Sequence, residues 1–266
     1  MDYETADGSQ FSLREIWTEH DDTPTFSCTS VTSFVEGKAF AGRLNKALHL
    51  LDDDEILACL EPVPPENINP PFPPEFTRAP SLDSSKYYLK APSFTYDDAQ
   101  NGKSFVADCL LNEATVLEQL KKTPHPNIVS YHGCVVEDSR IIRLCLSRYE
   151  QNLTSYIDER LSEDRKIQIM GDVEAGVLHL HSLGLAHNDI NPDNICLGQD
   201  GHHAVIIDFD SCMPFGQRLM KGKGNSSQPE DDGPISARAN DFDGLDMIHD
   251  FLWPRPDENT PRADDI

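Results

Sequence analysis

Two stretches in the second half of the chain carry apolar residues at the spacing of an amphipathic helix. Residues 105–122 read FVADCLLNEATVLEQLKK, and this pattern predicts a helix with Glu113 beside its apolar face. The second stretch, residues 162–184, predicts a longer helix that has Ser162 as its N-cap and ends at Gly184. The apolar face of this longer helix is expected to consist of Ile167, Met170, Val173, Val177 and Leu180. A third helix is expected in residues 240–253.

Strand-like segments lie around the first of these helices. KYYLKAPSF precedes it with an alternating pattern, and two apolar runs that flank a turn near Asp138 and Ser139 follow it. Another strand is expected in HHAVIIDFD, residues 202–210. The chain therefore passes from strands with one helix to mainly helices, which predicts an α+β fold with two lobes.

The first 80 residues are expected to form two further parts. Residues 1–60 are interpreted as an N-terminal extension of unknown role, and leucines at helical spacing predict a helix between Val31 and Leu60. Residues 61–80 contain eight prolines. Proline fixes φ and removes a backbone donor, so this stretch is expected to be an extended linker. Residues 81–266 form the third part, which holds the helices and strands described above.

The charge balance argues against some classes of partner. Lys and Arg total 22 against 46 Asp and Glu, a formal net charge of −24, whereas nucleic acid and anionic membranes attract clustered basic residues. The seven cysteines are scattered without a CxxC pair, which disfavours a zinc site and indicates a reducing compartment. Apolar runs are far shorter than the roughly 20 residues of a membrane-spanning helix. We therefore expect a cytoplasmic protein, with the nucleus left open, that has no nucleic-acid or membrane partner.

Three polar side chains have a spacing that is compatible with phosphate and metal chemistry. The stretch HNDINPDNICL, residues 187–197, places Asn194 five residues after Asp189. The strand-like run AVII that follows ends directly before Asp208. Carboxylate and amide oxygens are ligands that Mg²⁺ prefers, although Asp and Asn also cap turns. The spacing alone therefore leaves both interpretations open.

Several motifs in one order give the stretch from Tyr87 to Trp253 a resemblance to the eukaryotic-type protein kinase domain. HNDINPDN resembles the catalytic loop of that family, IDFD its metal-binding motif, and YYLK the strand with the ATP lysine. NEATVL resembles the helix with that lysine's glutamate partner, and PHPNIVSYHG and LHLHSLG resemble the segments after this helix and before the loop. The resemblance implies a bilobal kinase-like fold, with a small β-rich N-lobe containing one helix and a shortened, mainly helical C-lobe.

The resemblance also implies a role for five residues. Asp189 would orient and deprotonate an acceptor hydroxyl, and Asn194 and Asp208 would ligate Mg²⁺. Lys90 would hold the phosphates of ATP, and Glu113 would fix Lys90 through an ion pair. The implied cofactors are ATP and Mg²⁺, and the implied partner is a protein substrate or a binding protein. Without the resemblance, Lys90 is interpreted as a solvated strand lysine and Glu113 as a helix-surface charge.

Other positions depart from the family pattern. No glycine lies between Phe76 and Lys90, where a glycine-rich loop would approach the phosphates. Asn188 replaces an arginine that pairs with a phosphorylated activation segment, and Asn191 replaces a lysine beside the transferred phosphate. Asp210 replaces the glycine of the metal motif.

The resemblance extends to residues that support the loop and to the end of the chain. His187 is expected to pack against the loop and hydrogen-bond it, and either Asp241 or Asp243 is expected to anchor it from the last helix. The QPE sequence at Gln228–Glu230 resembles the motif that closes the activation segment. The chain ends at Ile266, soon after that helix, so we expect a truncated C-lobe.

Three interpretations of the function remain open. The first is a divergent protein kinase that transfers a phosphoryl group from Mg·ATP to a protein Ser/Thr hydroxyl, since all five polar residues are present. The second is a catalytically impaired pseudokinase that acts as a binding or scaffold module, which the departures favour. The third is a small-molecule phosphotransferase of the aminoglycoside or choline kinase type. HNDINPDN and IIDFD also resemble the loop and the metal motif of that group. Whether the chain is an enzyme depends on which of these holds.

Overall fold

A computed structural model gives the fold, and it divides the chain into two compact units that are described here separately. Unit 1 contains Met1–Glu118, Tyr131–Leu146 and Met220–Gly233. Unit 2 contains Gln119–Ser130, Ser147–Leu219 and Pro234–Ile266. Within these units the structure describes residues 2–4, 10–20, 23–35, 37–80, 83, 85–100, 102–156, 161–198, 203–220 and 234–254.

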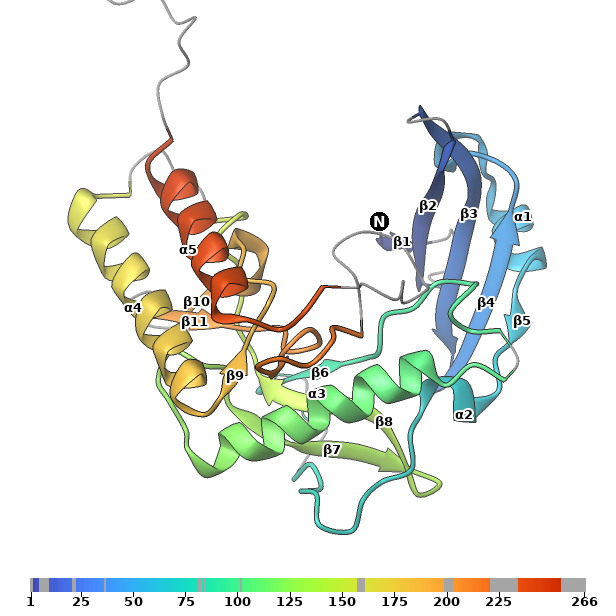
Figure 1. The fold of residues 1–266 in the computed structure, drawn as a ribbon. Helices are drawn as coiled ribbons and strands as arrows, with labels where there is room; N and C mark the ends of the chain where they lie inside the picture. The colour runs from blue at the N-terminus through green and yellow to red at the C-terminus, as the bar shows by residue number, and fades with distance from the viewer. Residues whose placement is uncertain are drawn as a thin grey trace, which may run out of the picture. The chain divides into compact units, whose positions relative to one another are not determined.

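Unit 1 begins with an antiparallel sheet of five strands in the order β1-β2-β3-β4-β5 (Figure 1). The strands are β1 (Asp2–Glu4), β2 (Gln10–His20), β3 (Thr23–Val35), β4 (Lys38–Leu44) and β5 (Glu61–Pro62). A 3₁₀ turn, η1 (Leu48–Leu50), and the short helices α1 (Asp53–Ala58) and α2 (Pro65–Ile68) follow β4 and β5.

The prediction of a helix between Val31 and Leu60 is wrong over most of that range. Strands occupy the described residues up to Leu44, and α1 is a single six-residue helix. The reason for the error lies in the burial of β3, because every residue from Cys28 to Ser33 is buried. A strand that is covered on both faces lacks the alternation of apolar and polar residues by which a strand is recognised.

A second sheet in unit 1 has three strands in the order β6-β8-β7. They are β6 (Tyr87–Lys90), β7 (Tyr131–Glu137) and β8 (Arg140–Ser147), and helix α3 (Phe105–Lys122) lies beside this sheet (Figure 1). The bounds of α3 match those predicted from its apolar spacing. Asp138 and Ser139 form the turn between β7 and β8 with φ values of 46° and 61°. Two left-handed residues suit the twist of a two-residue hairpin, so the predicted turn is confirmed.

Unit 2 is mainly helical. Helices α4 (Glu163–Ser182) and α5 (Arg238–Leu252) pack on each other (Figure 1). Two short antiparallel ladders complete the unit: β9 (Leu185–Ala186) with β12 (Met213–Pro214), and β10 (Ile195–Leu197) with β11 (Ala204–Ile206). A 3₁₀ turn, η2 (Pro192–Asn194), precedes β10.

Helix α4 has the predicted ends but a slightly rotated buried face. The hydroxyl of Ser162 accepts a hydrogen bond from the Arg165 N–H at 3.3 Å, which confirms the N-cap. Gly184 follows the helix with a φ of 77°, a conformation that glycine adopts without strain. Ile167, expected in the core, is 62% exposed, whereas Ile169 is buried. The buried face consists of Ile169, Val173, Gly176, Val177, Leu180 and His181.

The α+β architecture predicted from the order of the elements is confirmed. Unit 1 holds both larger sheets and one long helix, and unit 2 holds two long helices with short ladders. None of the helices that the structure describes has the length and apolar character needed to cross a bilayer. The division at residues 60 and 80 stays a prediction.

Candidate active site

Lys90 and Glu113 form an ion pair within unit 1. Lys90 is the last residue of β6, and its Nζ lies 2.6 Å from Oε1 of Glu113 on α3. The side chains are 18% and 4% exposed, respectively. A carboxylate as buried as that of Glu113 stays charged only when a cation or hydrogen-bond donors compensate for its lost hydration. The two residues therefore form the ion pair that the resemblance implied, and Glu113 is buried rather than a solvated surface charge.

In unit 2 the loop between β9 and β10 brings Asp189 and Asn194 into contact. The amide nitrogen of Asn194 donates to the main-chain oxygen and to Oδ2 of Asp189, both at 2.9 Å. Asn191 caps η2, because its side-chain oxygen accepts from the N–H groups of Asp193 and Asn194 at 2.9 and 3.2 Å. Asn191 therefore caps η2, and the Asn194 side chain bonds both the main chain and the carboxylate of Asp189.

Asp208 follows the strand that pairs with β10. The N–H of Ile207 donates to the carbonyl of Asn194 at 2.9 Å, so Asp208 comes one residue after a direct backbone contact with the loop. Asp208 has a φ of 61°, in the left-handed region that Asp and Asn tolerate better than most residues. Asn194 and Asp208 are 14 residues apart in sequence. The loop and the metal motif therefore meet at one end of the β10–β11 ladder.

The donor atoms at this place fit Mg²⁺. The amide nitrogen of Asn194 is used by Asp189, which leaves the amide oxygen to accept or to ligate. One carboxylate and one amide oxygen are hard ligands, and Mg²⁺ is commonly held by one or two such groups together with water and phosphate oxygens. Within the described ranges no group of three or more His, Cys, Asp or Glu residues is placed to hold a metal ion. Such a pair of ligands would suit a cation that also takes phosphate and water oxygens.

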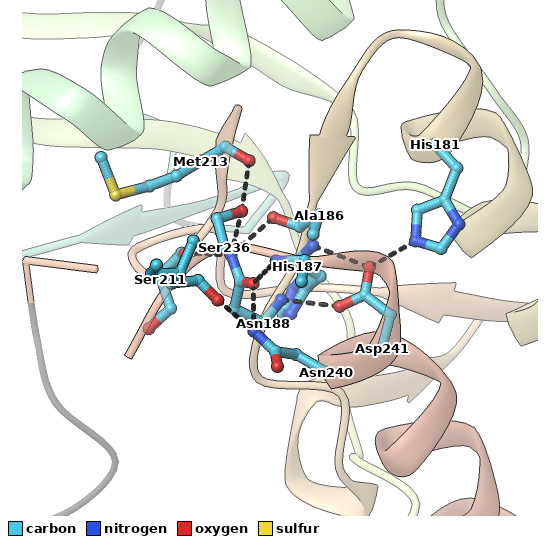
Figure 2. Close-up of polar contacts among 11 residues, drawn as sticks. His181, Ala186, His187, Asn188, Ser211, Met213, Ser236, Asn240 and Asp241 are labelled. Atoms are coloured by element: carbon cyan, nitrogen blue, oxygen red, sulfur yellow. Dashed lines mark hydrogen bonds and ion pairs between the residues drawn. The ribbon is translucent and has the colours of Figure 1, made fainter. Parts of the chain in front are cut away.

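Asp241 anchors the loop from the first turn of α5 (Figure 2). Its carboxylate is fully buried, and it accepts hydrogen bonds from the N–H groups of His187 and Asn188 at 3.0 and 2.7 Å. His181 of α4 lies 2.8 Å from the same carboxylate through Nε2. Asp243 is exposed. Of the two aspartates considered from the sequence, Asp241 is therefore the anchor.

Asn188 holds the loop to segments that lie far away in the sequence (Figure 2). The residue is 2% exposed and has a φ of 65°, and its amide group donates through the nitrogen and accepts through the oxygen. The side-chain nitrogen donates to the main-chain oxygens of Ala186 and Ser211 at 2.9 Å each and to Oγ of Ser236 at 3.1 Å. The side-chain oxygen accepts from Ala237 N at 3.3 Å and from Asn240 Nδ2 at 2.9 Å. The sequence marked Asn188 only as a departure, because these partners could not be identified from spacing.

Packing restrains the loop further. His187 is buried, its Nε2 lies 3.0 Å from the carbonyl of Ile207, and its ring meets the buried Phe209 edge to face, as the sequence predicted for His187. A Cβ on Gly244 of α5 would lie 2.5 Å from Cβ of Ile190, so a glycine is needed for this close approach of helix and loop. Gln228–Glu230 lie outside the described residues.

Comparison with known proteins supports the resemblance. The family model described as protein kinase domain matches residues 93–224. This span contains Glu113, Asp189, Asn194 and Asp208, and it begins three residues after Lys90. The pairing of Lys90 therefore rests on its contact with Glu113 rather than on the matched span.

Three kinases illustrate the relationship. The chain is 30% identical over 116 residues to serine/threonine-protein kinase shk2 of Schizosaccharomyces pombe, a match of 43% of this chain and 19% of that protein. It is 35% identical over 105 residues to 3-phosphoinositide-dependent protein kinase 1 of Arabidopsis thaliana, covering 39% and 21%. It is 31% identical over 104 residues to the human dual serine/threonine and tyrosine protein kinase, covering 37% and 11%.

These matches are partial, because the chain spans about a fifth or less of the length of these relatives. The family match nevertheless includes the catalytic-loop and metal-motif resemblances in one alignment, and the α+β fold with a β-rich first unit agrees with it. Residues 93–224 therefore resemble a divergent protein kinase domain.

Proposed function

We propose that the chain binds Mg·ATP and transfers its terminal phosphoryl group to a serine or threonine hydroxyl of a protein. The observation that supports this most is the contact between the loop and the metal motif, where the Ile207 N–H donates to the Asn194 carbonyl. It brings Asn194 and Asp208 to neighbouring strand ends, while Asp189 is fixed by the same Asn194 side chain. These are the groups that phosphoryl transfer requires beside the acceptor and the metal.

Each of the five residues has a proposed task in this reaction. Lys90, oriented by Glu113, holds phosphate oxygens by charge-assisted hydrogen bonds. Asn194 and Asp208 provide the protein ligands for Mg²⁺, which when bound neutralises charge on the phosphates. Asp189 accepts the proton of the attacking hydroxyl, and its bond to Asn194 keeps one carboxylate oxygen oriented.

Binding of Mg·ATP can be tested by thermal unfolding of wild type and Asp208→Asn. Asparagine is chosen because it tolerates the left-handed backbone at this position while it removes the metal-binding charge. A ligand at 100 times its Kd stabilises the folded state by about 2.7 kcal/mol, a rise in Tm of several degrees. We expect this rise for wild type with Mg·ATP and its loss in Asp208→Asn.

Asp210→Asn makes the same change two residues further on and is expected to keep most of the rise. Asp210 accepts a hydrogen bond from the Ser211 hydroxyl at 2.9 Å, which an asparagine oxygen can also accept. A wild-type protein with no Mg²⁺-dependent shift would refute the proposal, as would an unchanged shift in Asp208→Asn.

A further inference from the structure

Part of the proline-rich segment is paired with the second sheet of unit 1. We call residues 67–79 the strap. Near its start, the carbonyl of Pro70 accepts from the Ile141 N–H and the N–H of Phe72 donates to the carbonyl of Ser139, both at 2.9 Å. Further on, the strap forms a parallel bridge between Arg78 and Cys134 of β7. The strap therefore covers backbone groups on both strands of the β7–β8 hairpin.

Gly133 shows how closely the strap approaches β7. Its φ is 133°, and a Cβ added there would lie 2.6 Å from the carbonyl carbon of Arg78 and 2.7 Å from the nitrogen of Ala79. The neighbouring bonds are short, since Ala79 N lies 2.8 Å from the Cys134 oxygen and Cys134 N lies 2.7 Å from the Thr77 oxygen. Only a residue without a side chain permits this backbone contact.

The strap also holds helix α3. Glu118 of α3 accepts from both the N–H and the hydroxyl of Thr77, at 2.6 and 3.1 Å. Next to this contact, Tyr131 is buried, and its hydroxyl lies 3.1 Å from the thiol of Cys134. Burial, with contributions from Cys134 and Glu118, raises the pKa of Tyr131. Burial likewise raises the pKa of Cys134 to about 11, so both groups stay neutral beneath the strap.

A second contact lies at the start of α3. The side-chain nitrogen of Asn67 donates to the carbonyls of Ala99 and Gln100 at 3.0 and 2.8 Å, in the segment that leads into the helix. Ile68 is fully buried in a cluster that also contains Val106 of α3. The strap thus bonds the segment before α3 and bonds α3 itself at Glu118, so the two contacts lie on either side of Glu113 in sequence.

The geometry of α3 connects these contacts to Lys90. Glu113 and Glu118 are five residues apart, which is about 140° around a helix. One carboxylate consequently faces β6 and Lys90, while the other faces the strap. A helix fixed from two sides has little freedom to rotate Glu113 away from its lysine.

We propose that the strap is a positioning element for α3, with Thr77 and Glu118 as positioning residues that keep Glu113 paired with Lys90. Its effect on ATP rests on the proposed function, whereas its effect on the ion pair does not. The prolines suit this task, because they pre-set an extended backbone and lower the conformational entropy that the unfolded chain loses on docking.

The test measures how fast Lys90 reacts with acetic anhydride, together with the Kd for Mg·ATP. In Glu118→Ala the helix loses its two hydrogen bonds to Thr77 of the strap. We therefore expect Lys90 to be acetylated several-fold faster and Mg·ATP to bind roughly fivefold to tenfold more weakly. Gln119→Ala removes the exposed side chain next to Glu118 in sequence. It is expected to change neither the acetylation rate of Lys90 nor the Kd for Mg·ATP. In a protein that already carries Lys90→Met, adding Glu118→Ala is expected to cause no additional change in the Kd for Mg·ATP.

Two more variants separate positioning from general stability. Leu13→Ala removes a buried side chain from the cluster between the five-stranded sheet and α1, and it is expected to lower stability without changing Lys90 reactivity. Glu118→Gln keeps an acceptor oxygen and is expected to fold. Its increase in Lys90 reactivity is expected to be smaller than that of Glu118→Ala. Unchanged Lys90 reactivity in folded Glu118→Ala, or equal effects of Glu118→Ala and Leu13→Ala, would overturn the proposal. Wild type that binds no Mg·ATP would refute the proposed function, and Lys90 labelling would still decide the role of the strap.

Discussion

Asp241→Asn is expected to lower the free energy of unfolding by about 3 kcal/mol, although the two side chains have nearly the same volume. The Asp241 carboxylate accepts from three donors and is fully buried, with one oxygen facing Asn188 N and the other facing His187 N and His181. An amide has one acceptor oxygen, so its NH₂ group must face an N–H donor in either orientation. At least one buried N–H is then left without an acceptor.

Chemical denaturation of wild type and Asp241→Asn measures this loss, and Asp243→Asn provides the matched control. Asp243 is on the same helix but exposed, so its substitution is expected to change the free energy of unfolding by less than about 0.5 kcal/mol. Equal stability of Asp241→Asn and Asp243→Asn would show that the loop does not depend on this anchor.

Asn188→Asp is the converse substitution and is expected to make stability depend on pH. The Asn188 nitrogen donates to two main-chain oxygens, and an ionised carboxylate would place an oxygen against those same acceptors. Burial and the facing carbonyls favour the protonated acid, so the pKa of the introduced carboxyl is raised above its ordinary value of about 3.9. The protonated acid can donate one hydrogen bond, whereas the ionised form can donate none.

The direction of the effect follows from proton binding. Where the folded state holds a proton that the unfolded state has released, stability falls as pH rises. The free energy of unfolding of Asn188→Asp should therefore be closest to that of wild type near pH 4. It should fall by a further ~2–3 kcal/mol relative to wild type as pH rises through the raised pKa.

The measurement for Asn188→Asp is urea unfolding at a series of pH values, expressed as the difference from wild type. Gln168→Glu is the control, because it makes the same change of amide to carboxylate at an exposed position and keeps the acceptor for Arg165. The control difference is expected to stay flat with pH. A flat difference for Asn188→Asp as well would contradict the hydrogen-bond assignment of the Asn188 side chain.

Local patterns predicted the elements of the kinase-like region well. The bounds of α3 followed from apolar spacing, and the turn at Asp138 and Ser139 followed from the polar break between two strand patterns. The ion pair of Lys90 with Glu113 was predicted from the resemblance and is present in the structure. These features depend on neighbours in sequence or on a motif whose spacing is known.

Features that depend on distant partners could not be predicted. Asn188 bonds Ser211, Ser236 and Asn240, which are 23 to 52 residues away, and no periodicity connects them. Prolines led to the prediction of an extended linker in residues 61–80, because they disfavour a long helix or a central strand. The pairing of the strap's carbonyls and remaining N–H groups with a sheet could not be predicted from that composition. Strand β3 was missed because burial on both faces removes its alternation. Strand β2 does alternate between buried and exposed residues from Phe11 to Arg14, a signal that the prediction did not use.

Transfer of the terminal phosphoryl group of labelled ATP by wild type and Asp189→Asn is the most direct test of the proposed kinase activity. The acceptors are a mixture of proteins and the chain itself, with Mg²⁺ present. We predict serine or threonine phosphorylation by wild type, and a rate about 10²–10⁴-fold lower in Asp189→Asn, which keeps the Mg·ATP-dependent rise in Tm. Binding of Mg·ATP without transfer to any protein, and with no difference between the two proteins, would contradict the proposal and favour a pseudokinase scaffold. Transfer to small hydroxyl compounds alone would contradict it in favour of a small-molecule phosphotransferase.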